Sequence, residues 1–203
     1  FIPSKHDKEL CKFLDGYEVV FLVDRSDSME GGLGIGPHDI SRWTWCRREL
    51  SNFAAFMENC SGSPREAVFK VVPFNGEFQI NHAAKPLDLE RIFNEITPQG
   101  TTNLYAPMQT VIQSYFDDHA LAAKKGLLII VLTDGLPNQG DKVDELIINT
   151  SKMMGRSDQV VISLIEVGKT EEADKLFSEL DNELVGRGAS CDIVGAKHFE
   201  EVL

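Results

Sequence analysis

Short apolar runs alternate with longer amphipathic stretches along most of this 203-residue chain. The runs are rich in Val, Ile, Leu and Phe and are too short for buried helices. They therefore predict strands covered on both faces, as in a parallel sheet. The stretches between them repeat apolar residues at helical spacing, which predicts amphipathic helices. We expect strands over residues 19–23, 67–74, 77–80, 126–132, 160–167 and 191–194.

Helices are expected between these strands, over 8–14, 41–59, 87–96, 104–115, 140–154, 171–180 and, beginning at Lys197, 197–203. Asn75-Gly76 is a strong hairpin signal, so residues 77–80 should pair antiparallel with 67–74. The alternation favours an α/β fold: a doubly wound, mostly parallel six-stranded sheet, with one antiparallel edge strand and helices on both faces. We expect strand order 3-2-1-4-5-6 in one domain over 17–203, after an N-terminal lead-in over 1–16.

Composition narrows the possible functions. The net charge of −12 argues against a protein that binds nucleic acid or an anionic membrane, because a protein needs a basic face to bind either partner. No apolar run approaches the roughly 20 residues of a transmembrane helix, so direct membrane insertion is not expected. The chain begins at Phe1 rather than Met, which indicates a fragment or a processed product.

The four cysteines, Cys11, Cys46, Cys60 and Cys191, show no zinc-type spacing. Cys46 and Cys60 share one predicted helix, which would hold them about 20 Å apart and prevent a bridge between them. We therefore expect buried free thiols, which favours an intracellular, cytoplasmic location.

Candidate chemistry begins where the strand over 19–23 ends. Asp24, Ser26 and Ser28 follow it at alternate positions, and ligands of parallel sheets bind just beyond the carboxyl ends of strands. One carboxylate and two hydroxyls are hard oxygen ligands, which suit Mg2+, Mn2+ or Ca2+ better than zinc or copper. Taken alone, the same residues also fit an ordinary turn after a strand.

Two later stretches have related features. Gly100-Thr101-Thr102-Asn103 precedes the helix over 104–115, where a threonine helix cap is the plainer interpretation. Asp134-Gly135 follows the apolar run over 126–132 and repeats the strand-then-carboxylate pattern. The glycine-rich loop over 31–37 has a spacing like that of a dinucleotide loop. However, no helix begins at its last glycine and no Gly-Lys-Ser/Thr follows, so we interpret it as a mobile flap beside the site.

Taken together and in this order, Asp-x-Ser-x-Ser, Gly-Thr-Thr-Asn and Thr-Asp-Gly resemble the von Willebrand factor A (VWA) family, over about 17–203. In that family these motifs build a metal-ion-dependent adhesion site (MIDAS). The resemblance implies that the hydroxyls would touch the metal and that the carboxylates would hold it directly or through water. The implied metal ligands are Asp24, Ser26, Ser28, Thr102 and Asp134, and the possible rim residues are Arg25, Asp27, Thr101, Asn103 and Gly135.

The resemblance implies a non-enzymatic interaction module whose Mg2+, or Mn2+ or Ca2+, is completed by an Asp or Glu carboxylate of a partner protein. Asp27 stands where the family usually has Gly, and Arg25 beside it offsets the added charge. A metal-assisted phosphohydrolase is the alternative, as is a scaffold domain with a purely structural metal. A hydrolase also needs a general base, whereas His38, His82 and His119 are scattered and expected on the surface.

The expected last helix bears on regulation. In relatives with a switchable site, a shift of the final helix is linked to a rearrangement of the metal-binding loops. A helix from Lys197 to Leu203 would bury little apolar surface, so we expect it to hold neither arrangement of the metal-binding loops firmly.

Overall fold

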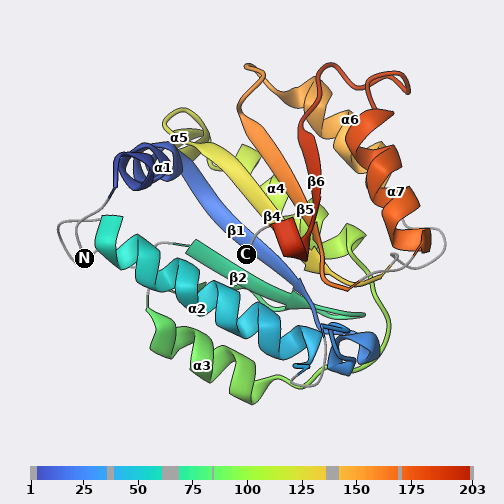
Figure 1. The fold of residues 1–203 in the computed structure, drawn as a ribbon. Coiled ribbons are helices and arrows are strands. Elements are labelled where there is room, and N and C mark those ends of the chain that lie inside the picture. The colour runs from blue at the N-terminus through green and yellow to red at the C-terminus, as the bar shows by residue number, and fades with distance from the viewer. Residues whose placement is uncertain are drawn as a thin grey trace.

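The computed structural model describes residues 4–35, 39–60, 69–83, 85–135, 142–168 and 171–201. These residues form one sheet of six strands in the order β3-β2-β1-β4-β5-β6 (Figure 1). Neighbouring strands are parallel except for β2 and β3. The predicted fold class and strand order are therefore confirmed. The strands are β1 Tyr17–Asp24, β2 Phe69–Phe74, β3 Asn81–Ala83, β4 Gly126–Thr133, β5 Val160–Glu166 and β6 Val194–His198.

Helices cover both faces of this sheet, as the sequence predicted. One core layer lies between the sheet and α2 and α3, and the other lies between the sheet and α4, α6 and α7. The helices are α1 Lys5–Asp15, α2 Arg42–Cys60, α3 Pro86–Glu95, α4 Tyr105–Asp117, α5 His119–Ala122, α6 Val143–Met153 and α7 Glu171–Asn182, with 3-10 turns η1 Asp27–Glu30 and η2 Phe199–Glu201. The expected helix start at 140–141 lies outside the described residues. None of the described helices has the length and apolar character needed to cross a bilayer.

The apolar run of β1 shows why the strand needs no polar face. Val20 and Leu22 point into the layer of α4, α6 and α7, whereas Val19, Phe21 and Val23 point into the layer of α2 and α3. Alternate side chains of a strand face opposite sides, so a strand buried on both sides must be apolar throughout. The central position of β1 follows from this composition.

The tryptophans of α2 belong to the core. Trp45 is 1% exposed and Trp43 is 8% exposed. Ser41 caps the helix, because the backbone N–H of Thr44 donates to the Ser41 hydroxyl at 3.1 Å. The cap fixes the first residue of α2, which becomes important at the site.

The antiparallel edge strand lies further along the chain than predicted. It is β3, Asn81–Ala83, and of the expected strand over 77–80 only Phe78 forms a bridge, with Phe74. Pro73 lies between these two pairings and has no N–H to donate, so the ladder is interrupted there. The Asn75-Gly76 turn exists but closes with Glu77, whose carbonyl accepts from the N–H of Asn75 at 2.9 Å.

The end of the chain also differs from the prediction. The last strand was expected over 191–194 and a helix from Lys197, but Lys197 and His198 lie in β6. Parallel pairing with β5, from Ile162↔Val194 to Glu166↔His198, decides this, because ladder hydrogen bonds outweigh a short segment's weak helical preference. The expected regulation by a last helix from Lys197 therefore loses its structural basis.

A disulfide joins Cys11 of α1 to Cys60 at the end of α2, which corrects the prediction of free thiols. Cys46 and Cys191 are the free cysteines, and Cys46 is buried. Cys46 and Cys60 do not bridge each other, as expected from their shared helix. Because two thiols are oxidised, cysteine state no longer supports an intracellular location.

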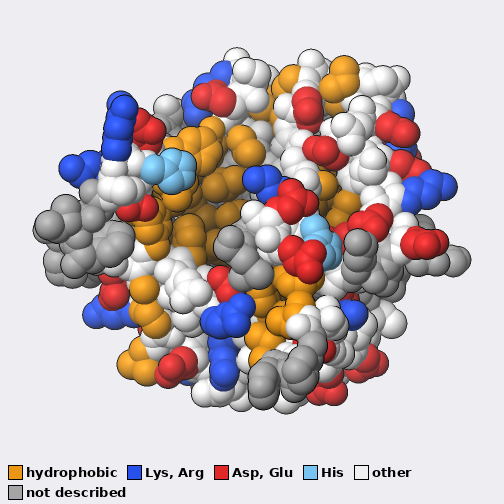
Figure 2. Space-filling view, in the orientation of Figure 1, with side chains coloured by type: hydrophobic (Ala, Val, Ile, Leu, Met, Phe, Trp, Pro, Cys, Tyr) orange, Lys and Arg blue, Asp and Glu red, His pale blue; other side chains and the backbone are white. Residues whose placement is uncertain are grey.

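Hydrophobic side chains reach the surface between α1, α2 and the sheet. They line an open hollow of about 340 Å³ (Figure 2). The lining includes Leu10, Phe53, Phe56, Ile130 and Ile165.

The predicted flap over 31–37 is described up to residue 35. This part is hydrogen-bonded, since the Asp39 carboxylate accepts from the N–H groups of Leu33 and Gly34, both at 2.9 Å. The remainder of the flap, and His38, lie outside the described residues.

Candidate metal centre

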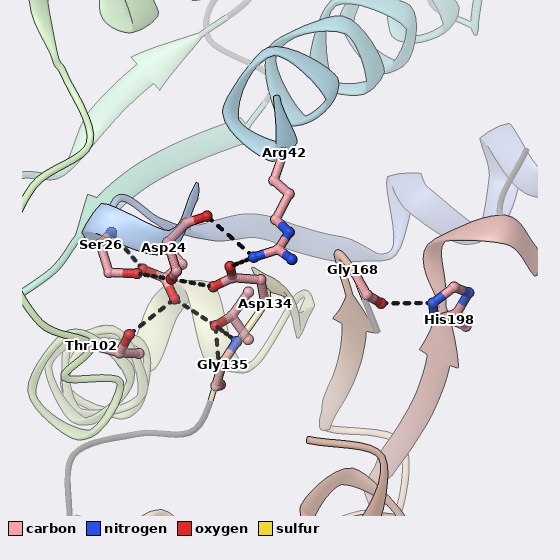
Figure 3. Close-up of polar contacts among 10 residues, drawn as sticks. Asp24, Ser26, Arg42, Thr102, Asp134, Gly135, Gly168 and His198 are labelled. Atoms are coloured by element: carbon pink, nitrogen blue, oxygen red, sulfur yellow. Dashed lines mark hydrogen bonds and ion pairs between the residues drawn. The ribbon is translucent and has the colours of Figure 1, made fainter. Parts of the chain in front are cut away.

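The predicted carboxylates meet where β1 and β4 end. The two strands are parallel neighbours in register, with Val23 paired to Leu132, so both chains leave the sheet at the same edge. Asp24 is the last residue of β1, and Asp134 lies one residue beyond β4. Thr102 comes to the same point from the loop before α4 (Figure 3).

Asp24 is fully buried and accepts three hydrogen bonds. Its Oδ1 accepts from the backbone N–H of Ser26 at 2.8 Å. Its Oδ2 accepts from the hydroxyls of Thr133 at 2.6 Å and Thr102 at 3.3 Å. Burial raises the pKa of Asp24, and the hydrogen bonds from Thr133 and Ser26 oppose that rise. A nearby cation would therefore stabilise the charged carboxylate.

The serine hydroxyls connect the first loop to Asp134. Ser26 Oγ and Ser28 Oγ lie 3.1 Å apart, and Ser28 Oγ donates to Asp134 Oδ1 at 2.8 Å. Ser26 is buried, whereas Ser28 is exposed. All five predicted metal ligands thus lie in one hydrogen-bonded group, drawn from three loops.

This group fits a hard divalent ion. Adjacent ligands of an octahedral Mg2+ with bonds of 2.0–2.1 Å lie about 2.9 Å apart. The hydroxyl and carboxylate oxygens are separated by 2.8, 3.1 and 3.3 Å, close to that spacing. The described residues contain no cluster of three or more His, Cys, Asp or Glu side chains arranged for a metal. The donors are therefore two carboxylates and neutral hydroxyls, which suit Mg2+ or Mn2+ better than zinc.

The choice between the adjacent threonines follows from their exposure. Thr102 is buried with its hydroxyl on Asp24, whereas Thr101 is exposed. Asn103 accepts from the backbone N–H of Ala106 at 3.3 Å, so it caps the start of α4. Gly135 approaches the Thr133 hydroxyl through its N–H, at 3.3 Å.

Asp27 and Arg25, two of the predicted rim residues, fasten the loops together. The Asp27 carboxylate accepts from the N–H of Gly100 at 3.0 Å, and the Asp27 N–H donates back to the Gly100 carbonyl at 3.1 Å. Gly100 has φ 79°, a left-handed conformation that favours glycine. The carbonyl of Arg25 accepts from the N–H of Gln99 at 2.7 Å. The Asp27 charge is thus engaged in holding the second loop against the first.

Sequence reasoning missed two residues of the site. Thr133 donates to Asp24, and although it opens the Thr-Asp-Gly motif, only Asp134 and Gly135 of that motif were named as site residues. Arg42, the first residue of α2, donates through Nη1 to Asp134 Oδ2 and to the carbonyl of Ser28 (Figure 3). No motif marks Arg42, because it is separated from Asp134 by 92 positions and only the fold brings them together.

The chain is similar to known proteins of one family. A family model described as von Willebrand factor type A domain matches residues 18–182. A search of curated proteins finds no match.

Several solved structures share the fold. The SpRpn10 VWA domain has 12% identity and a TM-score of 0.58, over 90% of this chain and 87% of that one. Manganese-loaded Plasmodium vivax TRAP protein has 17% identity and a TM-score of 0.56, over 93% and 71%. An aerotolerance-related membrane protein from Bacteroides fragilis NCTC 9343, with multiple mutations to serines, has 20% identity and a TM-score of 0.55, over 77% and 70%.

Proposed function

Because the chain belongs to the von Willebrand factor type A domain family, we propose that it is a metal-dependent protein-binding module. Mg2+, or Mn2+ or Ca2+, would be held by the hydroxyls of Ser26, Ser28 and Thr102. Asp24 and Asp134 would hold it directly or through water. An Asp or Glu side chain of a partner protein would complete the coordination.

One observation carries this proposal: oxygen atoms from three separate loops converge at the spacing of a metal's ligands. Loops after neighbouring parallel strands meet in any case, but ordinary turn formers would have no reason to place their hydroxyl and carboxylate oxygens in one hydrogen-bonded group. The manganese-loaded state of the structurally similar TRAP protein supports the same interpretation.

The neutral and the charged residues of the site have different roles. Neutral hydroxyls beside the metal donate little charge, so the ion, when bound, supplies a Lewis-acidic position for a carboxylate oxygen. Asp24 already accepts three hydrogen bonds, which favours contact through water rather than directly. Two carboxylates balance a divalent ion, so an acidic partner meets no excess negative charge.

The metal is tested by calorimetry with Mg2+ and Mn2+. We expect a single site in the wild type and affinity about tenfold lower or worse in Ser28→Ala, which removes one ligand. Ser114→Ala is the control, because Ser114 is exposed on α4, away from the three loops. A wild type that binds neither ion would contradict the proposal.

The partner chemistry is tested with acetate as a carboxylate probe and acetamide as its neutral counterpart. We expect acetate to raise the apparent Mn2+ affinity at constant ionic strength, and acetamide to leave it unchanged. Equal effects of acetate and acetamide would contradict the proposed carboxylate of the partner, but they would not contradict the metal site.

The phosphohydrolase alternative is tested in the same preparation. His82 and His119 are exposed, as predicted, and Asp24 is occupied by three donors, so none is placed as a general base. We expect no turnover of p-nitrophenyl phosphate with Mg2+. Turnover that Ser28→Ala abolishes would favour the enzyme.

A further inference from the structure

We propose that Arg42 is a built-in counter-ion of Asp134 that weakens divalent-metal binding at this site. The inference rests on the proposed metal site and adds to it a residue outside the three motifs. It concerns the strength of metal binding rather than the identity of the ligands.

The guanidinium is fixed on the metal-site carboxylate. Arg42 Nη1 donates to Asp134 Oδ2 and, at 3.2 Å, to the carbonyl of Ser28. The side chain of Asp134 is 1% exposed and that of Arg42 is 20% exposed. Water screens such a pair less than it screens a surface pair, so each charge acts strongly on its neighbours.

The surroundings of Arg42 show that Asp134, rather than the helix, holds it. Arg42 begins α2, where the helix dipole opposes a positive charge. The Nε atom of Arg42 is buried and has no hydrogen-bond partner among the described residues. The ion pair is therefore the main attraction that keeps the guanidinium in this position.

Gly168 leaves the space that the guanidinium occupies. A Cβ at Gly168 would lie 2.7 Å from Arg42 Nε, and its φ of 121° also favours glycine. The Gly168 carbonyl lies 2.7 Å from Nε2 of His198 in β6 (Figure 3). Gly168, two residues beyond β5, thus lies directly against the guanidinium, and the His198 side chain contacts the Gly168 carbonyl.

Arg42 and a bound metal would share one carboxylate. Asp134 Oδ1 faces the hydroxyl group of Ser28, and Oδ2 faces Arg42. Asp24, Asp134 and Arg42 together carry a charge of −1, so a divalent ion leaves the site at +1 instead of neutral. The repulsion between the two cations weakens metal binding by about tenfold or more.

The test compares Arg42→Gln with Arg47→Gln. Both variants remove one positive charge from α2, but Arg47 is exposed on the helix. Calorimetry measures Mg2+ affinity, and urea unfolding in EDTA measures metal-free stability. We expect R42Q to bind Mg2+ about tenfold tighter or better and to unfold at lower urea, because Asp134 loses its counter-ion. R47Q should match the wild type in both measurements.

The opposite signs of the two effects identify the counter-ion role. An arginine that only supports the fold would lower stability without tightening metal binding, and one that positions Asp134 for the metal would weaken binding when removed. Unchanged or weaker Mg2+ binding by R42Q, beside a wild type that binds, would overturn the Arg42 proposal alone. Absence of binding by both proteins would overturn the metal site and this proposal with it.

A second measurement needs no variant. NMR of the wild type follows the arginine Nε–H signals during Mg2+ titration. We expect the Arg42 signal to shift as the metal binds Asp134 and weakens the ion pair, and the Arg47 signal to stay in place. An Arg42 signal that does not move at saturating Mg2+ would contradict the proposal.

Discussion

Asp24 has two roles at the scale of a single residue. It ends the central strand in the core and also receives hydrogen bonds from Thr102, in the loop before α4, and from Thr133, the last residue of β4. Because burial disfavours its charge, the folded chain without a cation tolerates a neutral side chain there.

Asp24→Asn tests this directly. Asparagine keeps the shape and the Oδ1 acceptor for the Ser26 N–H but removes the charge that a metal needs. Its amide nitrogen would replace Oδ2, so the hydroxyls of Thr102 and Thr133 would have to accept instead of donate. We expect Mg2+ affinity to fall about tenfold or more, while stability in EDTA is kept or increased. Calorimetry and urea unfolding measure the two effects, with exposed Asp174→Asn as control. Unchanged metal affinity in D24N would remove Asp24 from the site.

Cys46 gives a second prediction at this scale. Burial raises the pKa of the Cys46 thiol well above its ordinary 9.0, and the negative charges of Asp24 and Asp134 add to the rise. An acid whose folded pKa is raised keeps its contribution to stability below the ordinary pKa and loses it as the pH rises above 9.0.

We therefore expect native Cys46 to resist iodoacetamide at neutral and mildly alkaline pH, since the thiolate is the nucleophile. Half-buried Cys191 should be the thiol that is alkylated. Unfolding without reductant should expose both free thiols, as mass spectrometry would show. Alkylation of native Cys46 at the rate of Cys191 would contradict its burial.

At the scale of elements, the chain pairs segments that its local pattern leaves unpaired. α1 is joined to the far end of α2 through Cys11 and Cys60, 49 positions apart. Pairing between strands likewise decides where the edge ladder is interrupted, at Pro73, and how far β6 extends, to His198.

The α1–α2 disulfide should stabilise the domain. Closing a loop of this length restricts the unfolded chain, so reduction should lower the free energy of unfolding by about 2–4 kcal/mol. Urea unfolding with and without dithiothreitol measures it. Cys11→Ser should behave like the reduced wild type, whereas Cys191→Ser should not. Identical stability of oxidised wild type and Cys11→Ser would show that the bridge contributes nothing.

At the scale of the whole molecule, the site joins two loops that follow β1 and β4 at one edge of the sheet with the loop between α3 and α4. A ligand that binds only the folded state adds stability through its binding equilibrium. We expect Mg2+ at about one hundred times its dissociation constant to add about 2.7 kcal/mol to the free energy of unfolding. Thermal unfolding at graded Mg2+ measures this. Ser28→Ala at the same concentrations should gain less, and an equal gain would place the ion elsewhere.

The sequence by itself determined the four inner strands, the strand order and, through the resemblance of three motifs to one family, the candidate ligands. Its apolar runs end at Asp24 and near Asp134, and parallel strands that are neighbours must end at one edge, so local pattern was enough to bring the carboxylates together. Thr102 was named only through the resemblance of Gly-Thr-Thr-Asn to the family's motif, because its loop joins α3 to α4 and no strand ends there.

Only the tertiary structure decided which distant residues act on that group. Arg42 reaches Asp134, Cys11 reaches Cys60, and His198 continues β6 because each finds its partner across the fold. Hydrophobic periodicity specifies which face of an element is buried, but it does not specify which residues pack against that face. Charge pairs, disulfides and strand ends depend on the opposite partner, so they were settled by packing.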